Sequence, residues 1–295
     1  MKRGPGGTAV VYLGALVLAI FTLGPLVLVF LASVLPEAGL IAVPPRWFQF
    51  GFTFDNYDYI FTGTIPQSYL VKGAIRSMIS QEVRLIPPAM LNSFLVAFAV
   101  MLLNWIAGCP AAFAYARFSF PGRRVSFFFV MASRLIPTVA LAVAYYAIVQ
   151  QLGLLDSHMA LIAIYAVLTL PFTLLILTLY FRGIPREIEE AAELDGCSPM
   201  QTLVRITAPL ALPGLIGTGL FAFMLSYSEF LFALLITTSI KSRTLPVILG
   251  SISLNPDVSW GLMNASIAIS ILPTLLLVVP VWRYMVRGLL AGGIG

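Results

Sequence analysis

The chain has 295 residues, of which 60% are apolar and only 10% are charged, and its mean hydropathy is +0.98. This composition excludes a soluble globular domain, in which about a quarter of the residues are charged. The net charge of +5 requires no nucleic-acid partner, because basic residues beside membrane helices face anionic lipid. The sequence therefore predicts an all-α integral membrane protein that contacts membrane lipid and binds no nucleic acid.

Apolar windows of the length that spans a bilayer, about 20 residues, recur along the chain. They predict six transmembrane helices in a single membrane domain that covers residues 1–295. The expected spans are 9–35, 89–116, 125–152, 159–180, 210–238 and 262–282. Prolines inside these spans predict kinks at Pro137, Pro171, Pro213, Pro273 and Pro280.

Basic residues near the span ends predict the orientation of the chain. Lys2 and Arg3 precede the first span, which has no cleavage site and is expected to be retained. With Lys2 in the cytoplasm, most basic residues fall on the cytoplasmic side, so both termini are expected there, in a bacterial or archaeal inner membrane. Cys109 and Cys197 then lie in different compartments and form no disulfide. The single histidine, His158, has no Cys/His cluster around it, so no metal site is expected.

The largest segment outside the membrane, 36–88, is expected on the external side. Within it, apolar residues recur at helical spacing from Leu70 to Ile79, with Lys72 and Arg76 on the other side. This pattern predicts an amphipathic helix on the outer surface or against the bundle. Both a space-filling role and the docking of an external partner fit this pattern.

The longest cytoplasmic connection, 182–209, is strongly patterned. Pro185 suits the first turn of a helix, and Gly196 suits the left-handed turn that ends one. Ser198 and Pro199 then suit the cap and the first residue of a second helix. The segment predicts two short helices, joined by a glycine turn, that project into the cytoplasm.

One residue string in this connection is the most specific signal in the chain. It reads Glu190-Ala191-Ala192, three residues, Gly196, nine residues, Ile206, one residue, Ala208 and Pro209. Ala191 and Ala192 share a helical face with Ile188, and their small side chains allow close approach of another backbone. The string resembles the EAA loop of importer-type ABC permeases, whose pattern has leucine where this chain has Ala208.

The resemblance extends over most of the chain and points to the carbohydrate-uptake branch of that family, which is MalG-like. The further matches are Phe54-Asp55-Asn56-Tyr57, Asn92-Ser93, Ala114-Tyr115-Ala116-Arg117-Phe118, Phe120-Pro121-Gly122-Arg123-Arg124, Gly153-Leu154-Leu155-Asp156, Pro171-Phe172, Ile184-Pro185-Arg186-Glu187, Asp195-Gly196 and Arg287-Gly288-Leu289. Their order and spacing together, rather than any one of them, make the resemblance specific.

The resemblance implies the type I ABC importer (MetI-like) permease fold, with six transmembrane helices and a cytoplasmic coupling helix. In that family, the EAA helix docks into a cleft of a cytosolic ATPase, whose closure on ATP switches the permease from inward- to outward-facing. By this resemblance, Glu190 makes the polar contact, Ala191 and Ala192 pack in the cleft, and Gly196 sets the turn. The implied coupling residues are Glu190, Ala191, Ala192, Asp195, Gly196, Ile206 and Pro209.

The implied partners are a second permease subunit that completes a heterodimer, a dimer of cytosolic ATPase subunits and an extracytoplasmic solute-binding protein. This chain has no Gly-x-x-x-x-Gly-Lys-Ser/Thr phosphate loop, so ATP and Mg²⁺ are expected on the ATPase. No catalytic residue and no directly bound cofactor are expected here. The expected function is import of a sugar or oligosaccharide. A non-sugar solute such as glycerol phosphate or a polyamine, an ion-coupled carrier, and an assembly protein are the alternatives.

Two ionisable residues fall inside expected spans, Arg134 in the third and Glu229 in the fifth. A charge at a helix centre costs about 2.5–3.5 kcal/mol on insertion scales, so such residues usually face a cavity or a partner. One interpretation is a polar translocation path lined by Arg134, Tyr227, Ser228, Glu229 and Asn264. The other is an ion pair between Arg134 and Glu229, or a polar contact with the neighbouring permease subunit.

Overall fold

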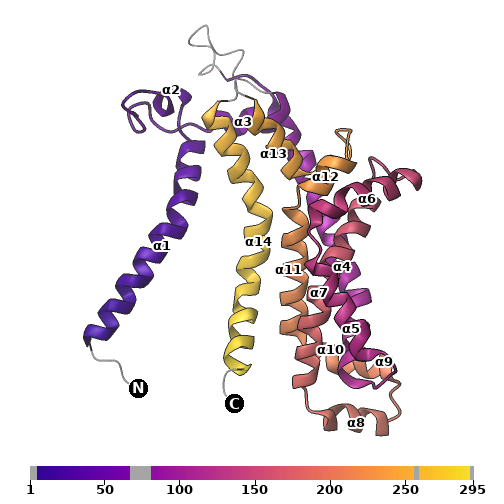
Figure 1. The fold of residues 1–295 in the computed structure, drawn as a ribbon. Coiled ribbons are helices and arrows are strands. Elements are labelled where there is room, and N and C mark those ends of the chain that lie inside the picture. Colours follow the sequence, from indigo (N-terminus) through magenta and orange to yellow (C-terminus); the bar gives the residue numbers. More distant parts are fainter. Residues whose placement is uncertain (1–4, 67–80, 256–258, 293–295) are drawn as a thin grey trace. The chain divides into compact units, whose positions relative to one another are not determined.

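The computed structural model describes residues 5–66, 81–255 and 259–292, and all regular elements in this part of the chain are helices (Figure 1). The amphipathic helix expected at 70–79 lies outside the described residues. The chain divides into two compact units, residues 1–87 with 248–272 and residues 88–247 with 273–295. Among the described residues, 4 helices are long and apolar enough to cross a membrane, or up to 6 if each of two bent helix pairs is one span.

Backbone amides and buried polar groups hold the first unit together. Its helices are α1 (Pro5–Ser33), α2 (Glu37–Leu40), α3 (Asp55–Thr62) and η2 (Gln81–Leu85), and it contains the beginning of α14 (Trp260–Gly292). The Glu37 carboxylate accepts hydrogen bonds from the amides of Trp260 (3.0 Å) and Gly261 (2.9 Å), so it caps the start of α14. The Asn56 amide donates to the buried carbonyl of Ser33 at 2.9 Å and joins α3 to α1.

The second unit is built around helices α4, α7 and α11. Its helices are α4 (Ile86–Arg117), α5 (Arg123–Ala132), η3 (Ser133–Leu135), α6 (Thr138–Gln151), α7 (His158–Gly183), α8 (Arg186–Leu194), α9 (Pro199–Thr202), η4 (Leu203–Thr207), α10 (Ala208–Leu210), α11 (Leu212–Tyr227) and α12 (Leu231–Ile236), with α13 (Leu245–Leu254) at its boundary. A side chain at Gly219 would overlap the Trp105 ring, so α11 and α4 pack closely there. The buried Asn104 bonds Thr169 (2.8 Å) and Thr173 (3.0 Å) and joins α4 to α7.

Two segments expected as spans are not continuous helices. In 125–152, helix α5 with η3 meets α6 at 100°, and the break lies at Pro137, which has no amide to donate to the preceding turn. In 210–238, α11 ends at Tyr227 and α12 begins at Leu231. Pro213 lies in the first turn of α11, just after an 85° bend, whereas Pro171 lies inside the unbroken helix α7.

The loop between α6 and α7 is tied to the segment after α12 by one carboxylate. Asp156 has a positive φ of 60°, a conformation that aspartate tolerates better than most residues. Its carboxylate accepts hydrogen bonds from the amides of Thr238 and Ser239, both at 2.8 Å, and from the hydroxyl of Ser242. The hydrogen bonds from Ser239, then those from Ser242 and Thr238, hold the pKa of the Asp156 carboxyl well below its usual range.

We expect Asp156→Asn to lower the thermal unfolding midpoint at pH 7, because a neutral amide oxygen accepts weaker hydrogen bonds. The folded-state pKa lies below the unfolded value of about 3.9, so the stabilisation is complete above that value and is lost as the pH falls further. The gap between the variant and the unaltered chain should therefore narrow below about pH 4. Thermal unfolding in detergent from pH 7 to pH 3 measures this gap, and a gap that stays constant would refute the role of the charge.

Candidate functional site

The two short helices and the glycine turn predicted for the connection after α7 are confirmed. Gly196 has a φ of +86°, and a Cβ at this position would meet nothing within 4 Å, so the turn needs glycine for its conformation rather than for space. The amide of Cys197 donates to the carbonyl of Ala192 at 3.0 Å, which closes the end of α8. Ser198 and Gln201 form a reciprocal capping box at the start of α9.

One face of α8 is buried against the second unit and the other is exposed. Ala192 is only 4% exposed, so it faces inward, away from Ala191, with which the sequence grouped it. The exposed face carries Glu190, Ala191 and Leu194, which lie within one turn of each other on the helix. Leu194 is 90% exposed although it is large and apolar. Leu194 lies beside Glu190 and Ala191 on this exposed face, and the sequence pattern did not single it out.

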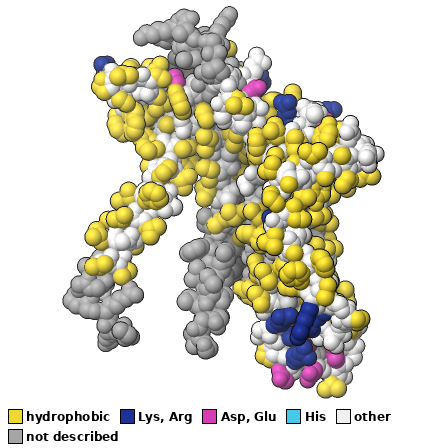
Figure 2. Space-filling model, viewed as in Figure 1, with side chains coloured by type: hydrophobic (Ala, Val, Ile, Leu, Met, Phe, Trp, Pro, Cys, Tyr) yellow, Lys and Arg dark blue, Asp and Glu magenta, His cyan; other side chains and the backbone are white. Residues whose placement is uncertain are grey.

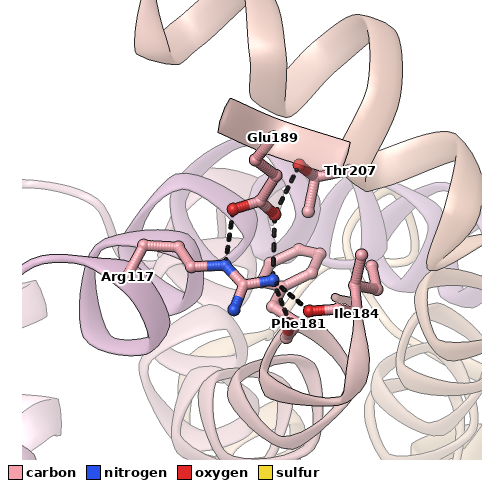
Figure 3. Close-up of polar contacts among 5 residues, drawn as sticks. All are labelled: Arg117, Phe181, Ile184, Glu189 and Thr207. Carbon is pink, nitrogen blue, oxygen red and sulfur yellow. Dashed lines mark hydrogen bonds and ion pairs between the residues drawn. The ribbon is translucent and has the colours of Figure 1, made fainter. Parts of the chain in front are cut away.

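The buried face of α8 is fixed by a network around Glu189 (Figure 3). The Glu189 carboxylate contacts the Arg117 guanidinium at 2.6 Å (Oε2 to Nε) and 3.0 Å (Oε1 to Nη2). The Thr207 hydroxyl donates to Glu189 Oε1 at 2.9 Å. Arg117 Nη2 also lies 2.6 Å from the carbonyl oxygen of Phe181 and 2.8 Å from that of Ile184. These five residues join the end of α4, the end of α7, the start of α8 and the turn η4.

The physical reason for this network is the cluster of carbonyl groups at the end of helix α7, where Phe181 also accepts a capping hydrogen bond from the Ile184 amide at 3.1 Å. The last carbonyl groups of a helix have no partner within the helix and carry partial negative charge, which a cation stabilises. Arg117 supplies that cation, and the Glu189 carboxylate balances the positive charge of Arg117. The side chains of Arg117 and Glu189 are each only 8% exposed, so neither group is solvated if the other is removed. Arg117 and Glu189 are 72 positions apart, which is why spacing along the sequence did not reveal the pair.

The remaining residues of the EAA-like string lie beside this network. Asp195 is exposed at the end of α8, where its amide donates to the carbonyl of Ala191 at 3.1 Å. Ile206 is partly buried in the π-helical turn η4, and Pro209 is exposed in α10. π-Helical turns are frequent at functional sites, and this one brings Thr207 to Glu189.

Arg134 and Glu229 line one cavity of about 150 Å³ in the second unit. They form no ion pair, since the structure shows none within 4 Å for these two described residues. Glu229 instead accepts hydrogen bonds from the Tyr165 hydroxyl (2.6 Å) and from the amide of Phe232 (3.1 Å), so it caps the start of α12. The Arg134 guanidinium lies 5.0 Å from the centre of the Phe172 ring.

The other three residues of the candidate path are not in the lining of this cavity. Tyr227 is buried and stacks on Phe223, with ring centroids 5.6 Å apart. Ser228 is exposed, and its hydroxyl donates to the carbonyl of Met224 at 2.9 Å. Asn264 donates to the carbonyl of Trp260 at 2.8 Å and lines a separate, mostly apolar cavity of the first unit.

Matched alanine variants of neighbouring glutamates test the network. Glu189→Ala leaves the Arg117 guanidinium buried without its counter-charge, which typically costs about 3–5 kcal/mol. Glu190→Ala removes an exposed side chain of the same type from the same helix and should change stability by less than about 0.5 kcal/mol. Thermal unfolding in detergent compares the two variants. Equal midpoints for Glu189→Ala and Glu190→Ala would show that the network does not stabilise this end of the protein.

The sequence profile of binding-protein-dependent transport system inner membrane components matches residues 105–287. The chain is 34% identical over 209 residues to the trehalose/maltose transport system permease protein MalG of Thermococcus litoralis, covering 70% of this chain and 75% of the relative. It is 31% identical over 283 residues to the sulfoquinovosyl glycerol transport system permease protein SmoH of Agrobacterium fabrum, covering 96% and 92%. Over 294 residues it is 29% identical to the diacetylchitobiose uptake system permease protein DasC of Streptomyces coelicolor, covering 100% and 99%.

Solved structures show the same fold. A chain of a bacterial ABC transporter involved in the import of the acidic polysaccharide alginate matches with a TM-score of 0.73 at 20% identity, covering 96% of this chain and 98% of that one. A chain of the MetNI methionine ABC transporter matches with a TM-score of 0.55 at 17% identity, covering 71% and 99%. The predicted all-α, MetI-like permease fold is therefore confirmed. The chain belongs to the family of binding-protein-dependent transport system inner membrane components, and it is a multi-pass permease subunit of an ABC importer rather than an enzyme.

Proposed function

We propose that this chain is the permease subunit of an ATP-driven importer for a sugar or oligosaccharide that an extracytoplasmic binding protein delivers. The observation that carries the proposal is helix α8, which exposes Glu190, Ala191 and Leu194 while Glu189 locks it to the ends of α4 and α7. The solute class is supported by the relatives, because three of them are named for transport or uptake of sugars or sugar derivatives.

In this proposal, α8 is the coupling helix. Glu190 makes a charge-assisted contact with the ATPase, and Ala191 and Leu194 pack against an apolar part of its cleft. Ala192 lies on the opposite, buried face of α8, where its small side chain lets the helix pack closely against the rest of the second unit. Gly196 sets the turn into α9, and Asp195, Ile206 and Pro209 shape the return to the membrane. ATP and Mg²⁺ bind to the ATPase subunits, and this chain binds neither.

The network around Glu189 gives the mechanical path from the ATPase to the membrane. A force on the exposed face of α8 acts through Glu189 on Arg117 and on the carbonyl groups at the end of α7. Because the ion pair and its hydrogen bonds are buried, no loose hinge separates α8 from these two helix ends. Closure of the ATPase dimer therefore moves the ends of α4 and α7 together with α8.

The translocation path is proposed to pass the cavity that Arg134 and Glu229 line. Its volume of about 150 Å³ is below the roughly 300–1,000 Å³ of typical small-molecule sites, so this conformation does not hold an oligosaccharide there. Glu229 supports the path by capping the start of α12. Arg134, which lies over the Phe172 ring, is the residue of this cavity that we propose contacts the solute. Tyr227, Ser228 and Asn264 stay candidates for the path in other conformations.

The proposed assembly contains a second permease subunit, which forms a heterodimer with this one, a dimer of ATPase subunits and the external binding protein. The proposed location is a bacterial or archaeal inner membrane with both termini in the cytoplasm. This orientation is supported by the basic residues near the helix ends, and it places α8 on the side where the ATPase lies.

Uptake assays in cells that lack this chain test the proposal. We expect uptake of one labelled sugar from a panel to be lost on deletion and restored by the unaltered chain, while glycerol phosphate and polyamine uptake do not change. Glu190→Lys should restore less than about a tenth of the rate, because a hydrogen bond to a charged group is worth about 1.5–3 kcal/mol. Glu193→Lys makes the same charge change on the flank of α8 and serves as the matched control.

Membrane levels of each variant are measured in parallel, and ATP hydrolysis is measured in the purified complex. Gly196→Asp, which strains the backbone of the turn because φ is +86° there, should also leave hydrolysis uncoupled from uptake. Normal uptake with Glu190→Lys at a normal membrane level would eliminate the docking role of α8. Loss of glycerol phosphate or polyamine uptake on deletion would instead identify a non-sugar importer.

A further inference from the structure

Arginines surround a concavity at the end of the second unit that carries α8. Its volume is about 590 Å³, within the range typical of ligand sites. The residues that line it come from the end of α4, the start of α5, the end of α7 and the start of α8. They are Arg117, Arg123, Arg124, Arg182 and Arg186, together with Tyr115, Ala116 and Phe127.

Four of these five guanidinium groups have no carboxylate within 4 Å among the residues that the structure describes. Arg117 is paired with Glu189 and is therefore already neutralised. Arg123 donates to the carbonyl of Phe118 (2.9 Å), and Arg182 reaches a backbone carbonyl of α4. Positive charge concentrated in a concavity without a counter-charge attracts an anion. Guanidinium groups also match the oxygen geometry of phosphate, which they bind with two parallel hydrogen bonds.

The surroundings of the concavity indicate which anion it meets. Figure 2 shows that the basic side chains at this end lie between the apolar surface of the helices and the acidic side chains of the tip. Next to Arg124, helix α5 exposes Val125 (59%), Phe128 (66%) and Phe129 (67%). Apolar side chains followed by arginine are typical of the level at which the phosphates of a bilayer lie.

We propose that this concavity binds the phosphate of an anionic phospholipid, whose acyl chains lie along the exposed apolar residues of α5. A free phosphate would use the same arginines but not the adjacent phenylalanines. The lipid bridges Arg123 and Arg124 of α5 to Arg182 and Arg186 at the junction of α7 and α8. The bound lipid thereby stabilises the packing of α5 against the junction of α7 and α8, beside Arg117. The assignment to the cytoplasmic leaflet rests on the proposed function, whereas the lipid binding does not.

Native mass spectrometry of the full-length purified chain, titrated with phosphatidylglycerol or with phosphatidylcholine of the same acyl chains, tests this site. The test variant is Arg124→Gln/Arg186→Gln, because both side chains are exposed and neither forms an ion pair within the described part of the chain. The control is Arg46→Gln/Lys241→Gln, which makes the same charge change at exposed residues that do not line the concavity. Thermal unfolding confirms that both variants are folded.

Each basic residue near the membrane surface strengthens anionic-lipid binding about fivefold, so the test variant should bind phosphatidylglycerol about 25-fold more weakly. The control should bind as the unaltered chain does, and phosphatidylcholine binding should not change in either variant. If the double variant does not fold, the single variants Arg124→Gln and Arg186→Gln replace it. Each of them should bind phosphatidylglycerol about fivefold more weakly.

Three results would overturn the proposal. They are equal binding of the two lipids by the unaltered chain, equal losses in the test and control variants, and displacement of the lipid by millimolar inorganic phosphate. A test variant that keeps its lipid preference but no longer assembles with the ATPase would identify the concavity as a protein-docking surface instead. The titration involves no transport, so its failure leaves the proposed function standing, and a failed uptake assay leaves the lipid site standing.

Discussion

The buried ion pair between Arg117 and Glu189 is the interaction on which the proposed coupling role of α8 depends. Such a pair adds stability only when further hydrogen bonds accompany the ion pair, and here the Thr207 hydroxyl and the carbonyl groups of Phe181 and Ile184 supply them. Loss of either Arg117 or Glu189 leaves the charge of the other buried without compensation. Because breaking this ion pair is costly, we expect α8 and the ends of α4 and α7 to move as one piece.

Carboxylates serve as ties between distant segments elsewhere in the chain. Glu229 caps α12 and accepts from Tyr165 on α7, Asp156 holds the amides of residues 238 and 239, and Glu37 caps the start of α14. Lipid is as apolar as leucine, so hydrophobic burial gives membrane helices little reason to associate, and polar ties and close packing at residues such as Gly219 take its place. In this chain, which has few charged residues, these acidic residues accept hydrogen bonds that hold separate segments together.

The sequence predicted the parts of the fold that depend on local rules. The apolar windows, the cap at Ser198 and the left-handed turn at Gly196 each follow from a few adjacent residues, and the structure has helices, cap and turn there. The breaks before Leu231 and the inward position of Ala192 depend on contacts with other segments, which spacing cannot show. The same holds for Glu189, which looks like one more glutamate in an acidic helix until Arg117 is placed beside it. A single sequence does not contain that pairing.

The central claim is that α8 and the end of α7 move as one rigid piece during the ATPase cycle. Spin labels at Glu193 on the flank of α8 and at Leu179 on α7, both exposed, report the distance between them in the assembled transporter, after Cys109 and Cys197 are replaced by serine. We predict one narrow distance distribution that does not change between the nucleotide-free and ATP-bound states, and a broadened one when Glu189→Ala is added. A distance in the Glu189-containing protein that shifts when ATP binds would contradict the account.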